Sequence, residues 1–140
     1  MKVFQPTTSY EIALPDDIVE DHDGKVASYW RPGSSVLLQL SSTSRFEGEQ
    51  VPAAARLQDL FKRNPVAWLP VEMKLQNFSG AFAAAQTRDE KGVTGIHAYL
   101  TTESVAIYAI VSAPAQELKR AADWALEAVR TLRLRPPLVN

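Results

Sequence analysis

The stretch that decides the fold spans residues 93–112 and runs VTGIHAYLTTESVAIYAIVS in one-letter code. Apolar residues alternate with more polar ones over residues 96–101, whereas residues 105–111 are apolar on both faces. Alternation is typical of a strand with one buried face, and a short run that is apolar on both faces indicates a central strand. Because only residues 102–104 separate the two strands, we expect them to pair as an antiparallel hairpin.

Working outward, an amphipathic helix is predicted from Pro114 to about Leu132, directly after this hairpin. Its apolar stripe must be buried against another element. The nearest candidate is the sheet face that carries Ile96, Ala98 and Leu100. The stripe consists of Leu118, Ala121, Ala122, Ala125, Leu126, Val129 and Leu132. The predicted fold class is therefore α+β, with an antiparallel sheet and this helix packed across it.

The rest of the chain supplies further strands and one more helix. Alternation or apolar runs predict strands over residues 9–14, 26–30, 36–42, 67–75, 78–87 and 93–100. A helix is expected after Pro52, and the Asn64-Pro65 pair ends it. Residues 16–24 are expected to form an acidic loop that closes in the Asp23-Gly24 turn, and residues 134–140 a loose tail.

Composition restricts the function more than it defines it. The 140 residues are enough for one core, so we expect a single domain over 1–140. Fifteen basic and sixteen acidic residues leave a net charge of −1, which argues against nucleic-acid binding. The N-terminus lacks the apolar core of an export signal, and no apolar run of about 18 residues occurs. These features predict a cytoplasmic protein that does not insert into membranes.

The order of these segments resembles the PsbP-like superfamily. The resemblance rests on the opening Tyr10-Glu11-Ile12-Ala13-Leu14-Pro15 pattern, on strands that end in Ser112-Ala113-Pro114, and on a helix that closes at Leu132-Arg133-Leu134. It implies an α/β/α sandwich, and a bacterial binding protein without a shared catalytic constellation. Because the chain starts without a leader, it resembles the cytosolic Eag-type chaperones of type VI secretion more than the exported DcrB-type members. The resemblance carries over no functional residue.

Metal and catalytic sites find little support in the residues. The densest acidic cluster lacks the ligand spacing of an EF-hand loop, so we expect a solvated loop and no metal. Its members are Asp16, Asp17, Glu20, Asp21, His22 and Asp23. His97 could act as a general base, but without a recognised partner it is better explained as a partly buried, hydrogen-bonded histidine. We expect no cofactor and assign no catalytic residue.

The stronger functional prediction is an apolar surface on the second face of the sheet. Its expected partner-binding residues are Phe82, His97, Tyr99, Tyr108 and Ile110. If the first helix leaves part of this face open, the groove suits an apolar or amphipathic helix of another protein. Alternatively, Leu57, Leu60 and Phe61 of that helix fill the face completely.

The leading hypothesis is a non-enzymatic protein-binding module, in its most specific form an Eag-type chaperone for a secreted effector. One alternative is a toxin-immunity protein, and another is a small hydrolase or isomerase that uses His97. The identity of the partner stays open, and so does a homodimer.

Overall fold

The computed structural model describes residues 1–7, 10–44, 53–63, 67–71, 81–89, 92–101, 105–114, 124–125 and 127–134. Most of these residues lie in strands. In chain order the elements are β1 (Lys2–Thr7), β2 (Tyr10–Leu14), β3 (Val19–Asp23), β4 (Val26–Trp30), β5 (Leu37–Ser44), α1 (Ala53–Arg63), β6 (Ala67–Val71), β7 (Ala81–Asp89), β8 (Gly92–Thr101), β9 (Val105–Ser112) and β10 (Arg133–Leu134). Residues 124–125 and 127–130 are also helical.

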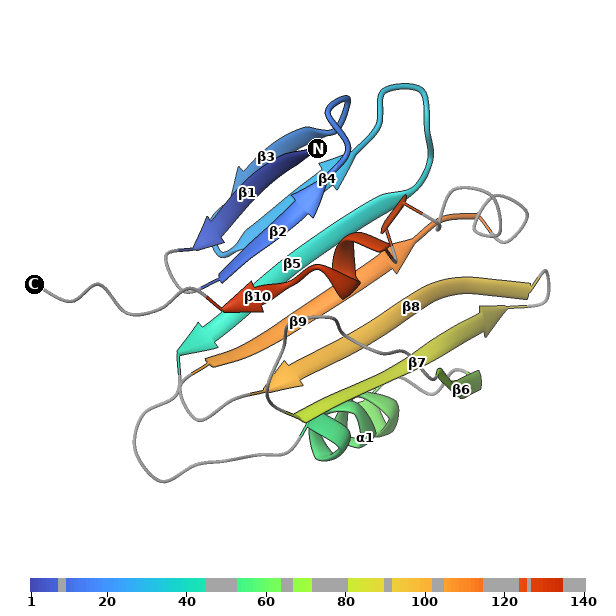
Figure 1. Ribbon diagram of the computed structural model, residues 1–140. Coiled ribbons are helices and arrows are strands. Elements are labelled where there is room, and N and C mark those ends of the chain that lie inside the picture. Colours follow the sequence, from blue (N-terminus) through green and yellow to red (C-terminus); the bar gives the residue numbers. More distant parts are fainter. Residues whose placement is uncertain are drawn as a thin grey trace, which may run out of the picture.

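The strands form two sheets, and every pairing in them is antiparallel (Figure 1). The larger sheet has the order β3-β4-β5-β9-β8-β7-β6, and the smaller has the order β1-β2-β10. The predicted antiparallel hairpin of β8 and β9 is confirmed, with Tyr99 opposite Tyr108. As predicted for a central strand, β9 lies between β5 and β8.

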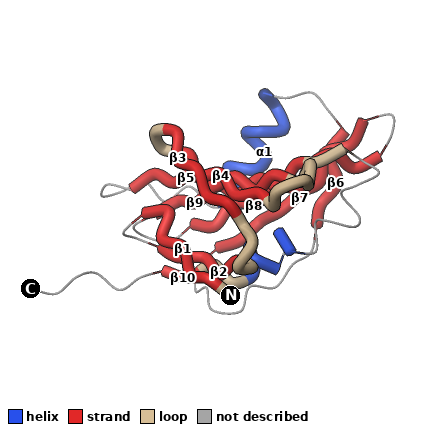
Figure 2. Tube along the Cα trace, turned by 90° about the horizontal axis from the view of Figure 1, so that it is seen from above, coloured by secondary structure: helices blue, strands red, loops and turns tan. Residues whose placement is uncertain are grey.

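Figure 2 shows the small sheet and α1 on opposite sides of the large sheet. The predicted fold class is therefore wrong: the described protein is mostly β, and a second sheet, rather than a helix alone, covers one face. The correction arises at the N-terminus, where β2 turns Tyr10, Ile12 and Leu14 into the core and β1 pairs beside it. An α/β/α sandwich requires a layer of helices on each face of its sheet, whereas here the second sheet takes the place of one of these layers.

The expected acidic loop is also a strand over part of its length. Strand β3 pairs with β4 through all five of its residues, after a turn in which Gly24 has a φ of 61°. Its acidic side chains are mainly exposed along the outer edge of the large sheet. Charged side chains on an edge strand oppose pairing with other chains, which gives this segment a structural reason for its composition.

The core fills the space between the two sheets. The described end of the C-terminal helix contributes Ala125, Ala128 and Val129, and Leu132 follows it into the same buried cluster. These residues belong to the same buried cluster as Ile96, Ala98 and Leu100 of the sheet, which agrees with the predicted packing over the described residues. Residues 115–123 and Leu126, which the prediction also used, lie outside them.

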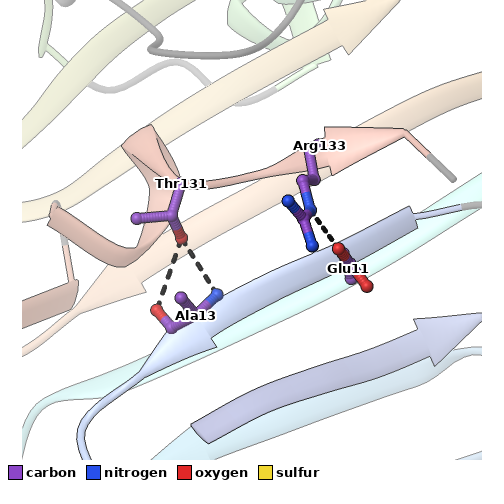
Figure 3. Close-up of polar contacts among 4 residues, drawn as sticks. All are labelled: Glu11, Ala13, Thr131 and Arg133. Atoms are coloured by element: carbon purple, nitrogen blue, oxygen red, sulfur yellow. Dashed lines mark hydrogen bonds and ion pairs between the residues drawn. The ribbon is translucent and has the colours of Figure 1, made fainter. Parts of the chain in front are cut away.

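Residues Thr131 and Arg133 near the C-terminus form polar contacts with strand β2 near the N-terminus (Figure 3). Thr131 accepts a hydrogen bond from the Ala13 amide at 3.0 Å, and its hydroxyl donates to the Ala128 carbonyl at 2.6 Å. Arg133 forms an ion pair with Glu11, whose side chain is mostly buried. Strand β10 then pairs with β2, so Leu134, where the loose tail was expected to begin, lies in a strand. Residues 135–140 lie outside the described part.

Candidate functional site

The second face of the large sheet, here called the α1 face because α1 lies on it, carries the predicted binding residues of β8 and β9. The register sets Tyr99 opposite Tyr108 and His97 opposite Ile110, so these four residues share one face. Their neighbours Ala98 and Ala109 point into the core. The common face of these four residues is confirmed, and their role in binding a partner stays a prediction.

Three of these residues form an aromatic row. The rings of Tyr99 and Tyr108 have centroids 4.7 Å apart with an interplanar angle of 31°, and the His97 ring lies 5.9 Å from that of Tyr108. The Nδ1 atom of His97 is hydrogen-bonded to the Tyr108 hydroxyl. This is the partly buried, hydrogen-bonded histidine expected from the sequence.

Electrostatics argue against His97 as a general base. Burial lowers the pKa of His97 to about 4, so the imidazole is neutral near pH 7. A general base is most effective when its pKa lies near the working pH, and a group with a pKa this low accepts a proton weakly. Burial likewise raises the pKa of Tyr108, which keeps its hydroxyl protonated. The pair is therefore suited to hydrogen bonding and packing rather than proton abstraction.

Phe82 does not belong to this group in the backbone register. It pairs with Leu100, a core residue, while Ala83 pairs with Tyr99. The reason is a register shift between Thr87 and Arg88. If the pairing at the hairpin turn continued unshifted, Phe82 would lie opposite Tyr99. A shift of one residue exchanges the two faces of a strand, so the prediction for Phe82 is corrected.

Helix α1 covers one side of the α1 face. It packs against β7 and β8, and its Leu60 is half-buried. The side chains of Leu57 and Phe61, which the sequence also suggested for this contact, lie outside the described ones. Farther across the face, β4, β5 and β9 present half-buried side chains, which we call the open strip: Val26, Ser28, Trp30, Leu37, Gln39 and Ile110. The helix therefore covers the β7–β8 side more than the β4–β5–β9 side.

A pocket lies where α1 meets the centre of this face. Its volume is about 230 Å³, and its polar lining consists of Lys25, Ser41, Ser42, Arg56, Tyr99 and Tyr108. Ala106 and Ile107 complete its wall. Sequence reasoning identified the two tyrosines and missed the cations, because Lys25 lies in the β3–β4 turn and Arg56 on α1, more than thirty residues apart.

The acidic segment shows no competing site. His22 lies 3.3 Å from the Glu20 carboxylate, which accepts a hydrogen bond from the Tyr29 hydroxyl at 2.7 Å. Among the residues that the structure describes, no three His, Asp or Glu side chains are grouped to hold a metal ion. Across the same ranges, no helix is long and apolar enough to cross a membrane.

Comparison with known proteins supports the fold alone. No protein-family profile matches the sequence, and no curated protein does. A crystal structure from Bacteroides thetaiotaomicron VPI-5482 is similar over 91% of this chain, with a TM-score of 0.57 and 18% sequence identity. The chain spans 45% of that protein's length. At this identity the likeness concerns the arrangement of strands, and the PsbP-like resemblance stays a prediction.

Proposed function

We propose that this protein is a non-enzymatic, cytoplasmic protein-binding module that uses the open strip of the α1 face. The observation that carries the proposal is the contrast between the two faces of one sheet. The core face of β4, β5 and β9 is fully buried, whereas the open strip keeps Trp30, Leu37 and Ile110 only half-buried. Partly exposed apolar side chains gathered on one surface are characteristic of protein-binding sites.

The proposed occupant is an apolar or amphipathic helix of another protein. A helix can lay one stripe of side chains on a sheet face, as α1 does on β7 and β8 of the same sheet. Gln39 and Ser28, which are hydrogen-bonded to each other at 3.3 Å, add polar atoms within the strip that can orient such a helix. Lys25 and Arg56 at the adjoining pocket favour a partner that carries acidic groups beside its apolar stripe.

In its most specific form, the module shields apolar helices of a secreted effector, as an Eag-type chaperone does. This form is supported by the sequence resemblance and by the open strip. A toxin-immunity protein could use the same surface. An enzyme built on His97 is disfavoured because burial keeps the pKa of that imidazole near 4.

Site-specific photocrosslinking in the source organism tests the proposal. A benzophenone amino acid replaces Ile110 in the open strip, and the matched control replaces Val3, which is 57% exposed on β1 of the small sheet. We expect one dominant protein to crosslink through position 110 and not through position 3. The captured protein is then purified, and its affinity is measured by calorimetry.

Truncation variants decide whether the surface contributes to that affinity. Ile110→Ala should weaken binding about 5- to 30-fold, the range expected for an apolar interface residue, while Val3→Ala leaves the affinity unchanged. Tyr99→Ala should weaken binding more than His97→Ala. A partner that crosslinks equally through both positions, or binds Ile110→Ala as tightly as wild type, would overturn the proposal. Loss of a catalytic turnover on His97→Ala would favour the enzyme instead.

A further inference from the structure

We propose that the pocket between α1 and strands β5, β8 and β9 is a binding site for a carboxylate attached to a small apolar body. This inference needs only the pocket and does not depend on the proposed docking of a protein helix. The carboxylate could come from a free organic acid or from an acidic side chain of a peptide. Three observations point to this chemistry: the cations, the hydroxyl groups and the size of the pocket.

Two cations at the pocket form no ion pair with any residue that the structure describes. Over the described ranges, Arg31, Arg63, Arg130 and Arg133 each form an ion pair with a carboxylate. In the same part of the chain, Lys25 and Arg56 form none, although both line the pocket.

The guanidinium of Arg56 also carries a buried donor. Its Nε atom is shielded from solvent and has no hydrogen-bond partner among the described atoms. A buried donor on a charged group is destabilising until an acceptor meets it. A guanidinium donates through a planar fork that matches the two oxygens of a carboxylate, so a carboxylate in the pocket would pair with the side of Arg56 that lines it.

Hydroxyl groups complete the polar side of the pocket. Tyr99 has no hydrogen-bond partner within the described residues, so its hydroxyl can donate to a ligand. Burial raises the pKa of Tyr99, while Arg56 and Arg63 oppose this rise and the Asp59 carboxylate adds to it. Arg56 and Tyr99 both line the pocket, so one ligand there can contact both. Ser41 adds a further hydroxyl from β5.

The size of the pocket limits the ligand. A volume of about 230 Å³ lies below the range of about 300–1,000 Å³ found for drug-sized pockets. The tyrosine rings and Ala106 provide an apolar wall that a strongly hydrated ion such as inorganic phosphate would not use. An acid of about the size of 3-phenylpropanoate, with the ring on this wall and the carboxylate at Arg56, suits both halves of the pocket.

Amide-detected NMR titration of the folded protein with 3-phenylpropanoate tests the inference, and neutral 3-phenylpropanamide serves as the matched control ligand. We expect the acid to shift the amides of Ser41 and Tyr108 saturably, with a Kd at least tenfold below that of the amide. Arg56→Gln should weaken binding of the acid at least tenfold and leave binding of the amide unchanged. Lys62→Gln, at an exposed position on the same helix, should leave both unchanged.

Further arms identify the source and guard against misfolding. An end-blocked Phe-Glu dipeptide that binds more tightly than 3-phenylpropanoate indicates a peptide carboxylate, whereas weaker binding indicates a free acid. If Arg56→Gln unfolds, Lys25→Gln in the exposed β3–β4 turn replaces it, with at least a threefold weakening expected. Equal binding of acid and amide, unchanged binding by the charge-removing variant, or preferential binding of inorganic phosphate would overturn the inference. The crosslinking experiment at position 110 tests the proposed function independently of these ligand-binding results.

Discussion

Replacing Thr131 with valine removes one hydroxyl group from the junction between the end of the chain and strand β2 (Figure 3). That hydroxyl accepts from the Ala13 amide at 3.0 Å and donates its single proton to the Ala128 carbonyl at 2.6 Å, while the Ala13 carbonyl lies 3.3 Å away as a longer alternative acceptor. Strand β10 pairs only with Tyr10 and Glu11, so Ala13 has no backbone partner in β10, and the Thr131 hydroxyl bonds to it instead. The hydroxyl thus provides hydrogen bonds to β2 two residues beyond Glu11, where the pairing with β10 ends.

The expected loss follows from the groups left behind. Valine has nearly the shape of threonine, so packing changes little, while the part-buried Ala13 amide loses its acceptor. Leaving such a donor unsatisfied is destabilising by about 1–3 kcal/mol, and we expect about 2 kcal/mol for Thr131→Val. For a domain of this length, that loss lowers Tm by about 7 °C.

Urea denaturation followed by tryptophan fluorescence measures the change, with Thr131→Ser as the matched control. Serine keeps the hydroxyl and loses one methyl group, so it should lose less than about 1 kcal/mol. Hydrogen exchange adds a local readout: the Ala13 amide should lose more protection in Thr131→Val than the Ala98 amide in the centre of the large sheet. The reasoning is refuted if valine is tolerated as well as serine, or if the Ala13 amide keeps its protection.

Three further predictions concern the core, the pH dependence of stability and the Glu11–Arg133 ion pair. Val129→Asp, at a site 2% exposed, should destabilise by at least about 3 kcal/mol and Val129→Ala by about 1–3 kcal/mol, both read from urea curves; equal losses would place the side chain outside the core. Because the pKa of His97 falls from 6.5 unfolded to about 4 folded, the unfolded state binds the extra proton, so stability present above pH 6.5 is lost as the pH falls toward 4. Between pH 7.5 and 5 the loss should be about 2 kcal/mol in wild type and in His22→Gln, and should disappear in His97→Gln; a loss retained in that variant would show another group to be responsible. Arg133→Met should destabilise the protein by about 1–2 kcal/mol because it leaves the Glu11 carboxylate without a counter-charge, and adding Glu11→Gln should recover part of this loss. Losses of the two single variants that simply add in the double variant, measured by urea denaturation, would show that the two residues are not coupled.

The local elements were largely predictable because their signals lie within short windows. Alternation in residues 26–30 and the apolar run at 105–111 predict β4 and β9, and the Asn64-Pro65 pair correctly marks the end of α1 at Arg63. The antiparallel hairpin of β8 and β9 followed from its short turn, and with it the shared face of Tyr99 and Tyr108. These inferences need only the period of the side chains and the length of the connections.

The predictions that were wrong depended on how strands meet. Strand β7 is rich in alanine, so its two faces look alike in the sequence, and a register shift beside Arg88 decided that Phe82 lies opposite Leu100. The polar start of the chain gave little sign of β1, which forms because β2 offers it a partner. Likewise, Lys25 and Arg56 share a pocket only because α1 folds onto the sheet beside the β3–β4 turn.

By itself, the sequence determined most strands, the position of α1 and the apolar stripe that packs at the C-terminal end, because periodicity and turn residues act over a few positions. Only the tertiary structure decided that a second sheet covers the core face, since β10 joins β2 from more than a hundred residues away. Pairing between strands so far apart in the sequence depends on which sheet edge is free and which apolar sheet face is exposed. Neither property can be inferred from the sequence of a single segment. The same long-range contacts placed the cations beside the tyrosines, and so created the pocket.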